Sequence, residues 1–319
     1  MPRFRFDRRH DLDTDDFDDI DAVRRHPAPS RRRSHPRVAD DDPTPLLIAP
    51  GAVTDESFAD DRLPAGATLS TYPESDHGPR PVPGWVITSG DAFDVELGVV
   101  KTGKEADVDL VQRVDMATGR TVLLAAKRYR SAQHRMFHRD AGYLEGRAVR
   151  RSREMRAMGN RTEFGRQLIA GQWAAAEFSM LGRLWSAGVP VPYPVQMSGT
   201  ELLLEFIGDV ATRTAAPRLA ETPRDRDAAR DLWQQCVAAV LALGAAGYTH
   251  GDLSPYNVLV HDGRLVLIDL PQVVDLFGNP QGLEFLARDC RNICTWFASR
   301  GVDADAEQLT RDVIDAASP

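Results

Sequence analysis

Residues 250–269 place two carboxylates and a carboxamide on two closely spaced segments of the chain. Asp252 is followed by four residues and then Asn257, and Asp269 follows the apolar run 265–268. Such short apolar runs are typical of buried strands. Carboxylate and amide oxygens are hard ligands that suit magnesium, and a carboxylate can also accept or orient a hydroxyl proton. This set of residues predicts phosphoryl transfer, in which the protein mainly positions groups and neutralises charge.

The spacing from His250 through Asp252 to Asn257 matches the catalytic-loop pattern of protein kinases, with Gly251 in place of the usual arginine. In this interpretation Asp252 is the catalytic base, and Asn257 and Asp269 are the metal ligands. Each residue also has a purely structural interpretation, because Asp252 could cap a turn, Asn257 could occupy a left-handed turn position and Asp269 could end a hairpin. The combination of all three at this spacing favours catalysis.

A lysine at the end of another apolar strand, 121–127, extends the candidate site. Lys127 would be costly to bury unless phosphates or a carboxylate compensated its charge. The helix expected over about 162–187 carries Glu177 among apolar and small residues. We therefore expect a Lys127–Glu177 ion pair, the alternative being that Glu177 lies on the helix surface.

The segment 95–111 predicts two strands joined by a glycine-bearing turn. Gly98 and Gly103 would let backbone amides approach a phosphate, although an ordinary hairpin turn fits the same pattern. Two further strands are expected at 189–195 and 200–208, with adenine against the backbone near Glu205 and Ile207.

Five strands with one long helix, followed by a hinge and mostly helical segments, predict an α+β fold of the two-lobed, protein-kinase-like kind. Residues 1–78 are rich in Arg, Asp and Pro and have few large apolar side chains, so we expect a disordered tail. Residues 79–207 are expected to form the five-stranded N-lobe, and residues 208–319 a reduced, mostly helical C-lobe with the catalytic loop.

Composition limits the other function classes. The net charge of −8 argues against a general nucleic-acid binder. Direct contact with nucleic acid is expected only through the basic tail or the segment Arg147–Arg156, and each of these could instead be a solvated charged surface. The sequence contains no apolar run of membrane-spanning length and no signal-peptide pattern, so a cytoplasmic, non-membrane protein is expected. The three cysteines, Cys236, Cys290 and Cys294, are expected to be buried small side chains.

The chain resembles the RIO family of atypical protein kinases, in particular the branch with a Ser-Thr-Gly-Lys-Glu-Ala phosphate loop. Five of these six positions match in Lys101-Thr102-Gly103-Lys104-Glu105-Ala106. Three further motifs follow in the right order, at 252–257, 268–272 and 283–290, and the resemblance covers residues from about 90 to 302.

The resemblance implies use of ATP and Mg²⁺, with Mn²⁺ as a substitute, to phosphorylate serine or threonine in a protein substrate or in the chain itself. It implies catalytic roles for Lys127, Asp252 and Asp269, metal binding by Asn257 and Asp269, and phosphorylation of Asp269 in an ATPase-like cycle. A ribosomal precursor is a partner by family analogy only. The expected nucleotide site comprises Gly98, Thr102, Gly103, Lys104, Glu105, Ala106, Lys127, Glu177, Glu205, Ile207 and Asn257.

Two other functions stay open. A small-molecule phosphotransferase of the aminoglycoside or choline kinase kind shares His250, Asp252 and Asn257, although the phosphate loop and the Leu-Pro-Gln after Asp269 weigh against it. A non-catalytic scaffold switched by nucleotide is the second alternative, which the complete set of catalytic groups does not favour. Two departures from the family pattern stand out: Lys101 replaces the loop serine, and Gly251 stands where the family often has alanine. The resemblance also implies that no Ala-Pro-Glu segment follows Asp269, so the usual docking surface for a peptide substrate is missing.

Overall fold

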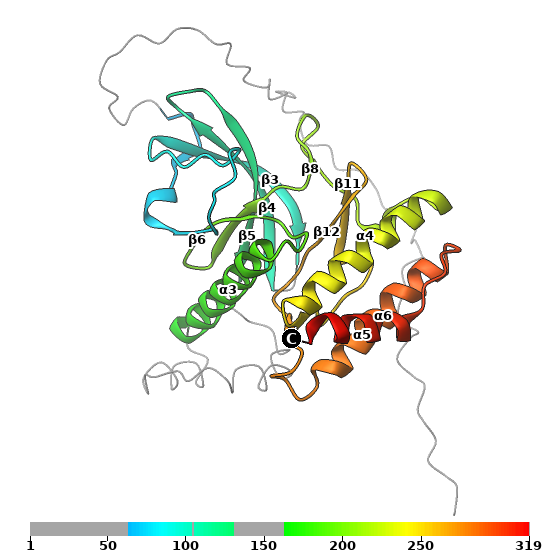
Figure 1. The fold of residues 1–319 in the computed structure, drawn as a ribbon. Helices are drawn as coiled ribbons and strands as arrows, with labels where there is room; N and C mark the ends of the chain where they lie inside the picture. Colours follow the sequence, from blue (N-terminus) through cyan, green and yellow to red (C-terminus); the bar gives the residue numbers. More distant parts are fainter. Residues whose placement is uncertain (1–62, 104, 131–162, 319) are drawn as a thin grey trace, which may run out of the picture. The chain divides into compact units, whose positions relative to one another are not determined.

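The computed structural model describes residues 63–103, 105–130 and 163–318, all within the compact unit Thr54–Pro319 (Figure 1). The second unit, Met1–Val53, lies outside the described residues, and so do Lys104 and the basic segment Arg147–Arg156.

A seven-stranded antiparallel sheet forms the N-terminal half, with the order β1-β3-β4-β5-β7-β6-β2. Five of its strands form a contiguous set, and four of them lie where the sequence predicts strands; the fifth, β6, begins only at Pro194, whereas a strand was expected at 189–195. The other two, β1 and β2, are short edge strands that precede residue 79, so the sheet begins within the segment assigned to the tail. The bounds are β1 Ala67–Leu69, β2 Asp76–His77, β3 Ala92–Thr102, β4 Ala106–Asp115, β5 Thr121–Tyr129, β6 Pro194–Ser198 and β7 Glu201–Glu205.

Strand β5 divides its side chains between the two faces of the sheet, as the period of two in a strand requires. Leu124 and Ala126 are buried in a small cluster with Tyr72, Tyr193 and other apolar residues. The intervening Ala125, Lys127 and Tyr129 line a cavity. The alternation therefore puts Lys127 on the cavity face of the strand, between Ala125 and Tyr129.

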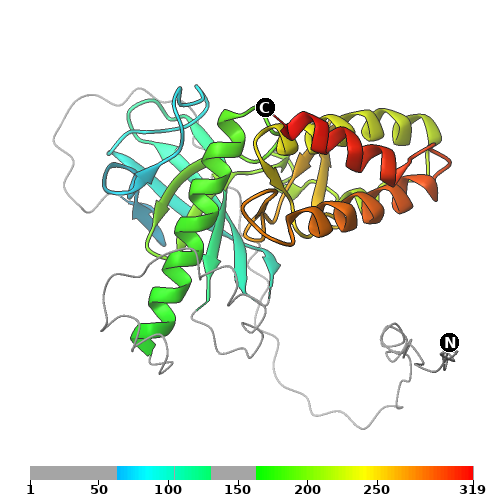
Figure 2. The ribbon, with the colours of Figure 1, turned by 60° about the horizontal axis from the view of Figure 1, so that its bottom comes forward.

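Helix α3, Glu163–Ser186, packs on this sheet against β5, β6 and β7 (Figure 2). Its buried residues recur every three or four positions from Ala170 to Leu184, which gives one apolar stripe. The helix ends where Gly188 takes a φ of 79° and the Val189 N–H donates to the Leu184 carbonyl at 3.0 Å. This is the Schellman arrangement that glycine permits.

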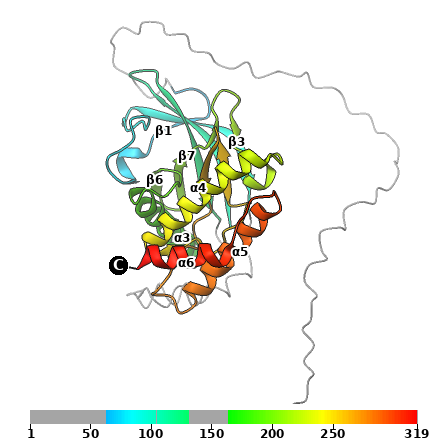
Figure 3. The same ribbon diagram turned by 45° about the vertical axis from the view of Figure 1, so that its right-hand side comes forward.

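The C-terminal half is mostly helical, with α4, α5 and α6 packed side by side (Figure 3). Asp225 caps α4 and Asp305 caps α6, since each side chain accepts two backbone N–H bonds. The remaining strands form three short antiparallel pairs. The bounds are η2 Tyr72–Glu74, β8 Gly208–Asp209, β9 Thr214–Ala215, η4 Leu219–Glu221, α4 Arg226–Ala245, β10 Tyr248–Thr249, β11 Val258–His261, β12 Arg264–Leu267, β13 Val274–Asp275, α5 Gly282–Ala298 and α6 Ala306–Ala317.

The main hydrophobic core is continuous between the two halves, because it joins Phe178 and Leu202 to Leu253 and Phe297. The three cysteines are free and buried within it, which confirms the expectation from the sequence. No helix in the described part of the chain is both long and apolar enough to cross a membrane. The α+β fold predicted from the sequence, with a sheet-based half and a mostly helical half, is confirmed.

Candidate functional site

The hairpin β11–β12 brings Asn257 and Asp269 together. Its two-residue turn is Asp262-Gly263, with φ values of 49° and 72°, and a type I′ turn requires positive φ at both positions. Val258 pairs with Leu267, and beyond this pair the Ile268 N–H donates to the Asn257 carbonyl at 3.0 Å. Asn257 and Asp269 therefore flank the open end of one hairpin.

Asp252 and Asn257 are in direct contact. The Asn257 Nδ2 donates to the Asp252 carbonyl at 2.9 Å and to its carboxylate Oδ2 at 3.2 Å. Asn257 is buried whereas Asp252 is exposed, so the carboxylate can meet a second molecule. Because the amide nitrogen is engaged, the Asn257 Oδ1 is the atom left to act as a metal ligand.

Asp289, on α5, holds this loop from the interior. The fully buried carboxylate accepts from the Thr249 hydroxyl at 2.8 Å and from the backbone N–H groups of Gly251 and Leu253 at 2.7 and 2.8 Å. Burial raises the pKa of Asp289, and these donors oppose that shift. The sequence analysis did not single out Asp289, although one signal was present: an acid at a helix position between the apolar Leu286 and Cys290.

His250 and Arg288 form two further hydrogen bonds that hold the loop 250–257. The His250 Nε2 lies 3.0 Å from the Ile268 carbonyl, and it must carry the proton there because a carbonyl only accepts. The Arg288 guanidinium donates to the Gly251 carbonyl. The loop 250–257 is thus fixed both to α5 and to the residue that follows β12.

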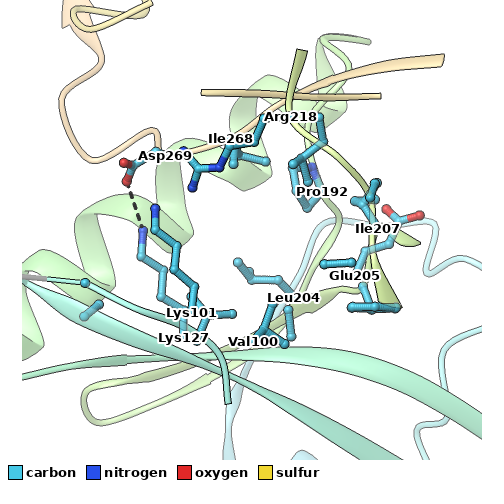
Figure 4. Close-up of a pocket in the computed structure, with 18 of the residues that line it drawn as sticks. Val100, Lys101, Lys127, Pro192, Leu204, Glu205, Ile207, Arg218, Ile268 and Asp269 are labelled. Atoms are coloured by element: carbon cyan, nitrogen blue, oxygen red, sulfur yellow. Dashed lines mark ion pairs between the residues drawn. The ribbon is translucent and has the colours of Figure 1, made fainter. Parts of the chain in front are cut away.

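Lys127 connects the sheet to Glu177 on α3 and to Asp269, which follows β12. Its Nζ lies 2.6 Å from the Glu177 Oε1. The same nitrogen lies 3.6 Å from the Asp269 Oδ1, the ion pair drawn in Figure 4. Burial on its own would lower the pKa of Lys127, but the carboxylates of Glu177 and Asp269 outweigh it and the pKa is raised. Tyr129 donates its hydroxyl to the second oxygen of Glu177. The predicted Lys127–Glu177 pair is therefore present in the structure.

A cavity of about 840 Å³ lies between the sheet and the C-terminal half, lined by residues of both. One part is apolar, with Ala125, Leu204 and Ile207, and another is charged, with Lys127 and Asp269. A cavity that combines an apolar wall with a few convergent polar groups is typical of a small-molecule site. Its size and two-part character suit a purine nucleotide.

The expected adenine-binding residues, Glu205 and Ile207, both line the cavity. The Glu205 carboxylate accepts from the Tyr193 backbone N–H at 3.0 Å, and burial raises the pKa of Glu205. The Ile207 carbonyl accepts from the Ala216 N–H at 2.9 Å. The segment 205–207 is thereby held by a hydrogen bond at each end.

The expected phosphate loop is the turn between β3 and β4. Gly103, Glu105 and Ala106 line the cavity, and the Gly103 N–H donates to the Ala106 carbonyl at 3.0 Å. Lys104 lies outside the described residues. Thr102 and Gly98 are not among the described cavity-lining residues, and Gly98 has a φ of 117° at an irregularity in the β3–β4 pairing. Any role of these last two in phosphate binding stays a prediction.

The residues suit a metal that is shared with a nucleotide. Within residues 63–103, 105–130 and 163–318, no three His, Cys, Asp or Glu side chains cluster in a way that could hold a metal ion. Magnesium is often bound by one or two protein oxygens together with phosphate oxygens, and Asn257 and Asp269 can supply such a pair.

Comparisons of this chain with a family model and with known proteins all identify the same family. Residues 120–309 match the RIO domain. The chain is 36% identical to the RIO-type serine/threonine-protein kinase Rio1 of Haloferax volcanii, over 69% of this chain and 68% of that protein. It is 30% identical to the serine/threonine-protein kinase RIO1 of Chaetomium thermophilum, over 68% of this chain but only 42% of that protein. The mouse serine/threonine-protein kinase RIO3 matches at 37% over 42% of this chain and 25% of its own length.

Proposed function

This chain belongs to the RIO family of serine/threonine kinases, and we propose that it transfers the γ-phosphate of ATP to a serine or threonine hydroxyl, in a protein substrate or in the chain itself. The observation that carries the proposal is the meeting of Lys127, Glu177 and Asp269 at the charged end of a nucleotide-sized cavity. A ribosomal precursor as substrate stays a prediction by family analogy.

Lys127 is the group that would neutralise charge on the phosphates. Glu177, with 2% of its side chain exposed, fixes the Nζ at 2.6 Å, and Asp269 lies on the other side at 3.6 Å. A cation held between two carboxylates is oriented before the nucleotide arrives, which lowers the cost of ordering it on binding.

Asp252 is the proposed base. It is exposed, and its backbone is fixed by Asn257 and, through the neighbouring amides, by Asp289. A hydroxyl that hydrogen-bonds to this carboxylate would be oriented for attack and would pass its proton to Asp252. Magnesium, held by Asn257 and Asp269, would neutralise the negative charge of the phosphates.

Asp269 is a second acceptor within the proposal. Its side chain is 47% exposed and lines the cavity. Attack of a carboxylate oxygen on the γ-phosphorus would form an acyl phosphate and release ADP, and water would then return the carboxylate and free phosphate. Such a cycle is an ATPase reaction without any other substrate.

Labelled ATP tests these roles. Wild type, Asp252→Ala, Asp269→Asn and the control Asp262→Asn would be incubated with γ-labelled ATP and magnesium. Asp262 is an exposed aspartate in the turn of the same hairpin, and asparagine accepts its left-handed φ. We expect label on wild type and control, and at least a roughly 100-fold slower reaction in the two site variants, the usual scale for loss of a base or of charge stabilisation.

The chemistry of the label separates the two acceptors. Hydroxylamine cleaves an acyl phosphate but not a phosphoserine or phosphothreonine, so label at Asp269 would be released and label at a hydroxyl retained. Equal labelling of Asp252→Ala and wild type would contradict the proposed base. ADP release stimulated by an aminoglycoside or choline would indicate a small-molecule phosphotransferase instead, and ATP binding without label or ADP would indicate a scaffold.

A further inference from the structure

Two cationic side chains in the cavity take part in none of the salt bridges among the described residues. Lys101, at the end of β3, and Arg218, which precedes η4, both line the cavity but take part in none of its ion pairs. Figure 4 shows Lys101 beside Lys127, both reaching from the sheet toward Asp269, with Arg218 coming from the other side of the cavity. Lys127 differs from them because Glu177 balances its charge.

Two cations, Arg218 and Lys127, act on Lys101, and the carboxylate of Asp269 opposes them. The pKa of Lys101 is lowered by burial, next by the charge of Arg218 and to a smaller extent by Lys127, while Asp269 acts in the opposite direction. Like charges that face each other in a partly enclosed space repel, and an anion between them would remove that cost.

Arg218 is fixed to the catalytic loop. Its Nη1 donates to the carbonyl of Tyr256, the residue before Asn257, at 2.8 Å. Its backbone N–H donates to the Glu221 carboxylate at 3.0 Å, and it forms a β-bridge with Leu259. The guanidinium therefore belongs to the C-terminal side of the cavity and Lys101 to the sheet side, and each retains N–H donors for a ligand.

We propose that Lys101 and Arg218 bind the phosphate chain of the nucleotide from opposite sides, in addition to Lys127. The inference rests on the proposed function, because it needs a nucleotide in this cavity. A di- or triphosphate offers several charged oxygens, and the planar guanidinium can meet two of them at once. Lys101 stands where the resembling phosphate loop has serine, so this chain would have a charged contact in place of a neutral one.

Binding measurements with three ligands test the inference. The dissociation constants of ATP, ADP and adenosine would be measured by calorimetry for wild type, Lys101→Ser, Arg218→Met and the control Arg230→Met. Arg230 is half-exposed on α4, where it pairs with Asp227. We expect Lys101→Ser and Arg218→Met each to weaken ATP binding roughly 10-fold and to change adenosine binding less than about 2-fold. The salt dependence of ATP binding should become shallower in both.

A second variant at position 218 distinguishes loss of the phosphate contact from disruption of the loop structure. Arg218→Lys keeps the charge without the planar fork, so we expect ATP affinity between those of wild type and Arg218→Met. Equal weakening of ATP and adenosine would overturn the inference, because it would indicate a structural role. Unchanged ATP affinity in Lys101→Ser and Arg218→Met would also overturn it. If the wild-type chain did not bind ATP, the proposed function would fail, and the inference with it.

Discussion

Gly251 shows how strongly one residue can be constrained in this site. It has a φ of 82°, and a Cβ at this position would lie 2.1 Å from the carbonyl oxygen of Gln272. Its N–H donates to Asp289 and its carbonyl accepts from Arg288. The backbone of the loop 250–257 thus passes so close to residue 272 that only glycine fits.

Gly251→Ala should therefore destabilise the protein far more than an ordinary glycine substitution. The matched control is Gly188→Ala, whose φ of 79° is similar but whose Cβ would meet no atom within 4 Å. We expect urea unfolding to show a loss of about 1 kcal/mol for the control, from backbone strain alone, and at least ~3 kcal/mol for Gly251→Ala, where overpacking adds to the strain. Equal losses would show that the close approach does not exist in solution.

The spacing of Asp252 and Asn257 could be recognised from sequence because it reflects local chain geometry. The constraint on Gly251 could not, since its two causes, a positive φ and a neighbour 21 positions away in the chain, arise only after folding. The role of Asp289 could not be predicted for the same reason, because its three hydrogen-bond donors lie 36–40 residues earlier in the chain.

At the scale of elements, the buried ion pair between Lys127 and Glu177 connects strand β5 to helix α3. Lys127 exposes 13% of its side chain and Glu177 2%, and Tyr129 adds a hydrogen bond to Glu177. Removal of Lys127 leaves the buried Glu177 charge with no cation and only the Tyr129 hydroxyl as a partner, which costs more than removal of both charges.

Stability measurements can separate these cases without any activity assay. We expect Lys127→Met to lose about 3–5 kcal/mol of unfolding free energy, because the buried Glu177 is left without a charged partner. The double variant Lys127→Met with Glu177→Met should recover most of this loss and lie within about 2 kcal/mol of wild type. Arg230→Met, which removes an exposed pair on α4, should change stability by less than about 0.5 kcal/mol. A double variant no more stable than Lys127→Met would contradict this account.

The sequence predicted this pair because a lysine in an apolar strand and a glutamate in an apolar helix stretch each required a partner. Elements with long periodic patterns were likewise close to prediction: the helix expected at about 162–187 is Glu163–Ser186. Short elements were not, since β1 and β2, with three and two residues, are too short to show any period.

At the scale of the whole molecule, the segment just before residue 79 is part of the folded structure. Strand β1 pairs with β3 and β2 with β6, and the buried Tyr72 stacks on His77 at a centroid distance of 4.2 Å. The Gln196 Nε2 donates to the Thr71 hydroxyl at 2.8 Å. These contacts lie at the edges of the sheet, whereas the cavity is lined by residues from Val100 onward.

Two truncations should therefore differ in stability but agree in nucleotide affinity. Removal of residues 1–62 leaves every described strand in place, so we expect the melting temperature of the full chain. Removal of residues 1–78 deletes β1, β2 and Tyr72, and the lost pairing and burial should lower the melting temperature by roughly 5–10 °C. Below both transitions, ATP affinity should agree within about 2-fold for all three proteins, because neither truncation reaches the cavity. A drop in ATP affinity confined to the longer truncation would show that the sheet edge shapes the nucleotide site.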